Sequence, residues 1–361
     1  MNSRNDGSTQ NSDRCQPRLA AATVVSAEPA IVPGVEPVKG IDTVTGYRFA
    51  PEHLRVADRR PGISAFMRIR NGEDFLEVTI RSHLRFFDEI VAVYNQCTDQ
   101  TASILQRLQQ EFGREKLRVI HYLDQVHPPG SEAHATTSPD SPNSLVNYYN
   151  FALASTRYQF VTKLDDDHLA IPATTAAVTD MIRSGRSSEN TMYCFSGLNV
   201  MRARDGRLAV PESDPVSGSG DIGIFRVTSE TLFAHDRRFE RFMRGGARRQ
   251  FCGFLYWHLK YLKKDMGFGN YELNRNPGSR YAKRHAALQD GSIRLIDLPE
   301  LRQSMQSGGL NRFLGWFSDK KALMSVRNAA IPEMFPDALL SDAISRTVSP
   351  EFRPAVLRPA A

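Results

Sequence analysis

Three consecutive carboxylates, Asp165, Asp166 and Asp167, are the residues of this sequence whose types and spacing point most clearly to chemistry. They follow residues 158–164, a run of apolar and β-favouring side chains that predicts a buried strand. Adjacent carboxylates repel one another unless a cation holds them, and hard oxygen ligands suit Mg²⁺ or Mn²⁺ better than zinc. The pattern therefore predicts a divalent cation that carries a phosphorylated ligand. The alternative is a solvated acidic turn, which the preceding strand disfavours.

The strand before these carboxylates is the last of four strands that the first half of the sequence predicts. The other three cover residues 63–69, 89–94 and 118–123, and amphipathic segments separate them. Because these segments are long enough for helices, the strands should run parallel through right-handed crossovers. We therefore expect an α/β fold with a doubly wound, mainly parallel sheet flanked by helices.

Three helices are expected to pack on this sheet. The first has apolar residues at helical spacing over 76–84, and the second has an apolar face over 104–112 and ends at Gly113. The third, at residues 145–156, leads into the strand of the carboxylates. The intervening segment 127–143 is too rich in Pro, Ser and Thr for regular structure. We expect it to be either disordered or a lid that becomes ordered over a ligand.

Polar side chains follow the predicted strands at the points where they end. They are Arg70, Asn71, Asn95, Asp99, Asp124 and the three carboxylates. The carboxyl ends of parallel strands meet at one edge of a sheet, so these side chains should lie close together. Such a polar cluster is of the kind that binds a nucleotide.

Three segments, in this order, resemble family 2 glycosyltransferases of the GT-A fold. They are Met67–Leu76, Asp88–Thr101 and Leu164–Asp167, and the resemblance covers roughly residues 61–172. It implies a mixed, mainly parallel GT-A-like sheet and the transfer of a sugar from a nucleotide-diphosphate sugar to the hydroxyl of a saccharide or glycolipid. It further implies a metal-dependent, inverting displacement in polysaccharide or glycolipid biosynthesis.

The resemblance also implies roles for residues of the first half. Asp165 and Asp167 correspond to the DxD pair that binds Mn²⁺ or Mg²⁺. The nucleotide-sugar would lie against Arg70, Asn71, Asn95, Asp99, Asp165 and Asp166. Many relatives have an aspartate that contacts the base where this chain has Tyr94. We expect Tyr94 to be a core aromatic residue, with stacking on the base as the alternative.

The second half is expected to bind the acceptor and to supply the catalytic base. Asp221 lies between the flexible residues 217–220 and a predicted strand, which makes it our candidate for the base, with a loop cap as the alternative. Glu240 matches the segment that follows this strand in the family and is the rival. A solvated or salt-bridged surface residue is the alternative for Glu240.

Two histidines of the second half are assigned different roles. An apolar helix is predicted over residues 251–262, with His258 as a core histidine. Several GT-A enzymes complete the metal shell with a C-terminal histidine, so the resemblance makes His285 a candidate metal ligand. The alternative for His285 is an ordinary basic surface helix.

Two other functions would also use the acidic run. A nucleotidyltransferase shares the doubly wound sheet, but it usually has a Gly-rich phosphate loop after the first strand, unlike Arg70-Asn71-Gly72-Glu73. A noncatalytic sugar-binding module with Ca²⁺ is the other alternative, but residues 168–172 lack the Gly and spaced acids of an EF-hand loop.

The composition restricts the class of protein. The net charge is +6, from 46 Lys and Arg against 40 Asp and Glu, without a basic block that would indicate a nucleic-acid-binding arm. The four cysteines form no CxxC pair, which argues against a zinc site or a disulfide framework. The sequence has neither a secretory signal nor an apolar run of membrane-spanning length. We expect a cytoplasmic protein, with peripheral contact at the inner face of the membrane as an option.

Three parts are expected along the chain. Residues 1–60 should form a disordered or loosely packed extension, because they lack sustained periodicity. Residues 61–300 should form the GT-A-like domain, with 61–172 as the nucleotide-sugar half and 173–300 as the acceptor half. Residues 301–361 should form a helical extension.

Overall fold

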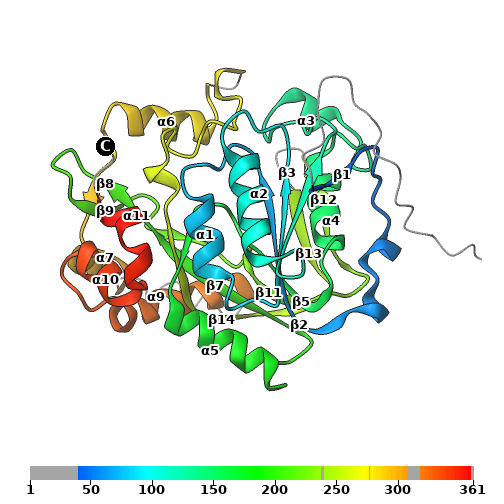
Figure 1. Cartoon of the computed structure of the whole chain (residues 1–361). Coiled ribbons are helices and arrows are strands. Elements are labelled where there is room, and N and C mark those ends of the chain that lie inside the picture. Colours follow the sequence, from blue (N-terminus) through cyan, green and yellow to red (C-terminus); the bar gives the residue numbers. More distant parts are fainter. Residues whose placement is uncertain (1–39, 237–239, 276, 307–317, 359–361) are drawn as a thin grey trace, which may run out of the picture.

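A computed structural model describes residues 40–236, 240–275, 277–306 and 318–358. Its centre is a ten-stranded sheet with helices on both faces (Figure 1). The strands of this sheet are β1 (Asp42–Val44), β2 (Arg60–Ile69), β3 (Glu89–Tyr94), β4 (Leu117–Tyr122), β5 (Tyr158–Lys163), β6 (His168–Ala170), β7 (Thr191–Asn199), β10 (Val216–Ser217), β11 (Gly223–Arg226) and β14 (Arg248–His258).

The order of the strands is β1-β4-β3-β2-β5-β11-β7-β14-β6, with β10 paired to β7. The five strands from β1 to β5 run parallel, whereas β11 is antiparallel to both of its neighbours and β6 is antiparallel to β14. The expected mixed, mainly parallel sheet is therefore confirmed. The chain proceeds outward from β2 to β4 and then returns to β5 on the other side of β2. The carboxyl ends of β2 and β5 consequently form the switch point where open α/β sheets bind ligands.

Helices cover the two faces of the sheet. Helices α1 (Leu76–His83) and α2 (Thr101–Phe112) lie in front of it in Figure 1, and they share one hydrophobic core with α5 (Pro172–Arg183). Helix α4 (Leu145–Ala154) packs on the opposite face. The apolar periodicity expected for the first two helices is confirmed, since Leu76, Ile80, Leu105 and Leu108 are completely buried.

One predicted helix is wrong. Residues 251–258 belong to strand β14, which pairs with β7 over most of its length and with β6 at its end. A continuous apolar run is compatible with either a buried strand or a buried helix, and here the aromatic side chains pack on both faces of the sheet. Two register shifts interrupt the pairing with β7, the first next to Gly253 with φ +136°.

The beginning of the described chain and the segment 127–143 both contain more structure than expected. Strand β1 pairs with β4, and Leu54 is buried in a short helical turn, so order begins before residue 60. Residues 1–39 of the expected extension lie outside the described residues. The segment 127–143 contains a short helix, α3 (Glu132–Thr136), because the hydroxyl of Ser131 accepts a hydrogen bond from the backbone N–H of His134.

The C-terminal helices pack against the sheet. They are α7 (Leu298–Gln306), α9 (Asp319–Met334), α10 (Leu340–Thr347) and α11 (Pro354–Leu357). They share a third hydrophobic core with β6 and β14, and Trp257 Nε1 of β14 donates a hydrogen bond to Thr347 Oγ1 at 2.9 Å. The C-terminal segment therefore supports the strand that carries His258.

The remaining elements form the margins of the molecule. They are the hairpin of β12 (Thr231–His235) and β13 (Glu240–Arg244), the small sheet of β8 (Met201–Arg202), β9 (Leu208–Pro211) and β15 (Leu295–Ile296), and helix α6 (Arg280–Gln289). Asp205 and Gly206 lie in the turn that joins the antiparallel strands β8 and β9. Among the described helices, none has both the length and the apolar character needed to cross a bilayer.

Candidate functional site

A cavity of about 550 Å³ opens at the carboxyl ends of β2 and β5. The acidic run forms part of its wall, together with Arg70 and Asn71 after β2 and His258 at the end of β14. Residues from the segment 260–271 close another side. The cavity therefore lies at the switch point of the sheet, where the sequence predicted a ligand site.

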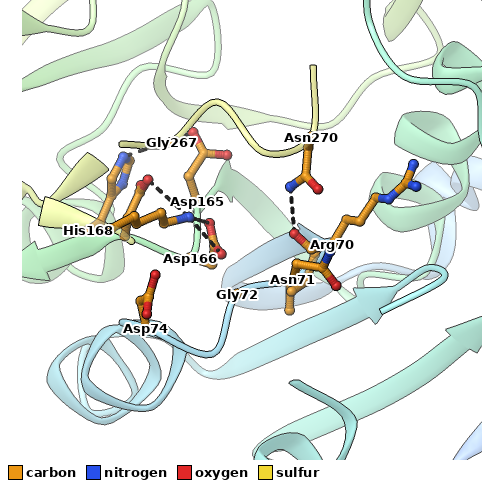
Figure 2. A network of polar contacts seen from close by, with 12 residues as sticks. Arg70, Asn71, Gly72, Asp74, Asp165, Asp166, His168, Gly267 and Asn270 are labelled. Carbon is orange, nitrogen blue, oxygen red and sulfur yellow. Dashed lines mark hydrogen bonds and ion pairs between the residues drawn. The ribbon is translucent and has the colours of Figure 1, made fainter. Parts of the chain in front are cut away.

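The turn between β2 and α1 approaches the acidic run closely. A Cβ atom on Gly72 would lie 2.4 Å from Asp166 Oδ2, so a larger residue here would have to displace the Asp166 carboxylate from its place beside Lys263. Figure 2 shows this turn passing below Asp166, while Asn270 donates a hydrogen bond to the backbone oxygen of Arg70 at 2.6 Å. Asn71 has a left-handed backbone (φ 52°), and its Oδ1 accepts from the N–H of Thr98. These contacts fix the turn against the next strand-end loop.

Basic side chains surround the three carboxylates. Lys163 and Arg68 lie 3.1 Å and 3.5 Å from oxygens of Asp165. The ammonium of Lys263 lies 2.9 Å from Asp166 Oδ1 and 3.4 Å from Asp167 Oδ2. The acidic run is therefore a charged and compensated site and not a solvated turn.

Burial and charge act in opposite directions on these carboxyl groups. Burial, together with the nearby Asp167, raises the pKa of Asp166 to about 6 even though Lys263 counteracts it. Burial would also raise the pKa of Asp167, but the charges of Lys263 and His258 outweigh it and hold that pKa well below its ordinary value. The carboxyl group of Asp167 therefore stays ionised more readily than that of Asp166.

Hydrogen bonds determine which ring nitrogen of His258 faces the carboxylate. Asn199 Nδ2 donates to the backbone oxygen of Asp214, so the Oδ1 atom of Asn199 faces His258 Nδ1 and accepts its proton. In the neutral ring, Nε2 then carries a lone pair, and it lies 3.3 Å from Asp167 Oδ1. Two lone pairs at this distance repel each other unless a proton or a metal ion lies between them.

His168 adds a third donor atom to the same place. It is buried and stacks on Tyr256 at 3.7 Å, and burial lowers its pKa to about 3, which keeps the imidazole neutral. His168 Nε2 and Asp167 Oδ1 are buried without a hydrogen-bond partner among the described residues. With His258, they offer donor atoms that all lie within 4.8 Å of one another. Asp165 Oδ2 lies 4.0 Å from His168 Nε2, so this donor set has the composition and compactness that a divalent cation needs.

Two lysines stand beside these donors. Burial lowers the pKa of Lys260. Its ammonium lies 4.8 Å from the ring centroid of Phe268 and 5.5 Å from that of Tyr271. Lys260 and Lys263 both line the cavity. Two ammonium groups next to a cluster of carboxylates suit a ligand that carries several negative charges.

The nucleotide-side residues predicted from the sequence divide into two groups. Arg70, Asn71, Asn95, Asp165 and Asp166 line the cavity. Asn95 is largely committed to the fold, because its amide nitrogen donates to the backbone oxygens of Tyr122 and Asp124. Asp99 is not among the described lining residues and instead caps backbone N–H groups of Glu73 and Thr101. Tyr94 is buried and stacks on His121, as expected for a core aromatic residue.

Both candidates for the base reach the same cavity. Asp221 lines it from the start of the β11 segment, and its Oδ1 accepts a hydrogen bond from the N–H of Ser219 at 2.8 Å. Glu240 lines it from the first residue of β13 and is hydrogen-bonded to the hydroxyl of Tyr149. A second cavity of about 740 Å³ also borders Asp221 and Glu240, so these two carboxylates lie between two spaces.

His285, the expected metal ligand, does not lie beside the acidic run in the described structure. Its ring is 5.2 Å from that of Phe268, and it lines a separate cavity beside α6. Among the described residues, the histidines next to Asp167 are His168 and His258. The sequence signal for His168 was its position directly after the carboxylates, and the signal for His258 was its position at the end of an aromatic-rich run that forms a strand.

Several solved structures show partial similarity to this chain. A mannosyltransferase from Pyrobaculum calidifontis in complex with GDP-Man and Mn²⁺ is 20% identical over 40% of this chain and 37% of its own, with a TM-score of 0.26. Glucosyl-3-phosphoglycerate synthase from Mycobacterium tuberculosis, in complex with Mn²⁺, UDP and glucosyl-3-phosphoglycerate, is 18% identical over 45% of this chain and 52% of its own, with a TM-score of 0.24. The chain thus spans about half or less of the length of these proteins. Neither a protein-family model nor a curated protein matches the sequence.

Proposed function

We propose that this chain is a metal-dependent glycosyltransferase that moves a sugar from a nucleotide-diphosphate sugar to an acceptor hydroxyl. The observation that carries the proposal is the compact set of donor atoms on the buried Asp167 and His168 and on His258, in a cavity that Lys260 and Lys263 also line. The resemblance of residues 61–172 to family 2 glycosyltransferases supports the same activity. Synthesis of a polysaccharide or a glycolipid is the setting that we propose.

The proposed chemistry divides among the residues of the cavity. Mn²⁺ or Mg²⁺ would be held by Asp165, Asp167, His168 and His258, and when bound it would neutralise charge on the diphosphate of the donor. Lys260 and Arg70 would bind the same diphosphate and stabilise it as the glycosidic bond breaks. Asn71 would orient the nucleoside, and segment 127–143, of which Pro128 lines the cavity, would order over the donor.

The proposed base is Asp221, and Glu240 is the rival. A base must come within about 3 Å of the acceptor hydroxyl, on the side of the sugar opposite to the diphosphate. Asp221 is exposed and borders both cavities, whereas Glu240 is already engaged by the hydroxyl of Tyr149 and lies close to Arg68. The displacement would invert the configuration of the anomeric carbon.

Binding of nucleoside diphosphates tests the donor site directly. We expect Mn²⁺ together with UDP or GDP to raise the melting temperature of the protein, because both bind only the folded chain. In Asp167→Asn, one donor oxygen is lost, and we expect the metal-dependent part of this shift to disappear while the fold is retained. Asp205→Asn, in the exposed turn between β8 and β9, is the matched control. An unchanged metal-dependent shift in Asp167→Asn would refute the assignment.

The base is tested by two isosteric substitutions assayed with the same donor. Asp221→Asn should lower turnover by about two to four orders of magnitude and leave donor binding nearly unchanged, because a general base acts on the transition state. Glu240→Gln should retain most of the turnover. If Asp221→Asn keeps its turnover and Glu240→Gln loses it, the two roles are exchanged.

A further inference from the structure

The ammonium of Lys263 forms ion pairs with carboxylate oxygens next to the proposed metal site. Its Nζ lies 2.9 Å and 3.0 Å from the two oxygens of Asp166, and 3.4 Å from Asp167 Oδ2. The side chain of Lys263 is only 10% exposed, and those of Asp166 and Asp167 are 14% and 8% exposed. The ammonium is therefore the principal counter-charge that the described residues offer these two carboxylates.

Asp167 connects this ammonium to the metal donors. One of its oxygens faces Lys263, while the other faces His258 Nε2. A divalent cation on Asp167 would therefore lie a few ångströms from the ammonium, in a cavity of low exposure where like charges repel strongly. Removing Lys263 without a replacement would in turn leave Asp166 and Asp167 buried and uncompensated.

The surroundings of Lys263 offer its ammonium a second position. Lys263 follows the short turn Lys260–Leu262 in a segment without regular structure, and it lines the cavity on the same side as Lys260. A lysine has a flexible stem and a compact charge, so it can change partners without a change in the fold. When the carboxylates bind the cation, a diphosphate in this cavity would take their place as the negatively charged partner of Lys263.

We propose that Lys263 and the divalent cation compete for the carboxylates of Asp166 and Asp167, and that metal binding transfers the ammonium of Lys263 to the diphosphate of the donor. This inference rests on the proposed metal and nucleotide sites. It predicts that the cation binds weakly to the protein alone and more tightly when a nucleoside diphosphate is present. By linkage, the cation strengthens the binding of the nucleotide by the same factor.

Calorimetric titration of the full chain with Mn²⁺, alone and with UDP or GDP, tests the competition. In Lys263→Met the competitor is absent, so we expect Mn²⁺ alone to bind at least tenfold more tightly than to the unmodified protein. We expect the nucleotide to bind at least tenfold more weakly in the presence of saturating Mn²⁺. In Lys263→Met, the factor by which Mn²⁺ and the nucleotide strengthen each other's binding should therefore be smaller than in the unmodified protein.

The neighbouring lysine provides the control. Lys264 is 78% exposed and pairs with Glu73 and Asp74, outside the acidic run. Lys264→Met removes the same charge one residue away, and we expect its Mn²⁺ affinity to stay within about threefold of the unmodified protein, since exposed charges are screened. A tenfold gain in both variants would mean that net charge alone acts, and would overturn the proposal.

The remaining outcomes separate this inference from the proposed function. If the unmodified protein binds Mn²⁺ and nucleotide but Lys263→Met binds Mn²⁺ no more tightly, the competition is refuted and the glycosyltransferase proposal stands. If Mn²⁺ binds none of the proteins, both proposals fail. Should Lys263→Met not fold, Lys263→Gln, which can still donate a hydrogen bond to Asp166, serves in the same comparison and must show the same gain.

Discussion

At the scale of single residues, the orientation of His258 in the site depends on one amide outside the cavity wall, that of Asn199. Asn199 accepts the Nδ1 proton of His258, and its own amide nitrogen is held by the backbone oxygen of Asp214. This arrangement directs Nε2 of His258 at Asp167. A histidine ligand of a metal is commonly oriented in this way by a second hydrogen bond.

We predict that Asn199→Leu weakens the binding of Mn²⁺ by about 10- to 100-fold, because His258 loses the acceptor that fixes its tautomer and ring orientation. Calorimetric titration with Mn²⁺ measures the change, and a thermal unfolding curve reports whether the variant is folded. Asn190→Leu, on the exposed turn before β7, is the matched control and should keep its affinity. Equal Mn²⁺ affinity in the two variants would contradict a positioning role for Asn199.

The sequence revealed the acidic half of this site but not the imidazole half. Three neighbouring carboxylates after an apolar strand are visible in one segment, and so are Arg70 and Asn71 after the first strand. His258 comes from a strand 91 positions after Asp167, and no local pattern relates the two. Similarly, the pairing of Lys263 with Asp166 depends on how a segment without regular structure folds back over the sheet.

At the scale of elements, helix α1 carries a buried histidine toward the strand that follows the acidic run. His83 on α1 is completely enclosed, its Nδ1 bonds to the backbone oxygen of Thr79, and its ring stacks on Phe87. The neighbouring Ser82 accepts a hydrogen bond from the N–H of Ala170 in β6. Burial lowers the pKa of His83 from 6.5 to about 4, despite the opposing effect of Thr79.

The lowered pKa of His83 predicts that the stability of the folded protein depends on pH. As the pH falls below 6.5, the unfolded chain takes up the proton before the folded chain does, so stability is complete above pH 6.5 and is lost progressively toward pH 4. Since one pKa unit corresponds to about 1.4 kcal/mol, the loss due to His83 is about 3 kcal/mol.

Urea unfolding at pH 7.5, 5.5 and 4.5 measures this dependence. In His83→Leu the titrating group is absent, and we expect the decrease in unfolding free energy between pH 7.5 and 4.5 to be smaller than in the unmodified protein. Half-buried His127→Leu serves as a comparison on the rim of the cavity. If the unfolding free energy falls by the same amount in His83→Leu and in the unmodified protein, protonation of His83 does not destabilise the folded chain, and this prediction is wrong.

The elements themselves could be predicted to different extents. Strands β2 to β5 and helices α1, α2 and α4 follow from local patterns, because each apolar run is bounded by polar residues or glycine. Strand β14 could not be recognised, because it is buried on both faces and its apolar residues therefore do not alternate. Its identity as a strand depends on β7 and β6, which lie far away in the sequence.

At the scale of the whole molecule, the segments before residue 60 and after residue 301 that the structure describes pack on the central sheet and are not separate extensions. Order begins before the expected boundary at residue 60, and the C-terminal helices share a core with β6 and β14. Three hydrophobic cores flank one sheet, and two of them contain residues of β14. Composition and local periodicity report only whether a segment can pack, and the surface on which it packs is set by the tertiary fold.

The continuity of the sheet also limits how the molecule can move. Asp165 follows β5 and His258 ends β14, and the hydrogen-bonded strands β11 and β7 lie between them in the same sheet. A rotation of the two halves about a hinge would break these ladders, so the hinge closure seen in two-domain enzymes is not open to this chain. In the proposed function, substrate and product would therefore exchange through displacement of cavity-lining segments outside the sheet, such as 127–143 and 259–275. Simple loop motions take nanoseconds to microseconds, and the opening of a lid that orders over a ligand takes microseconds or longer.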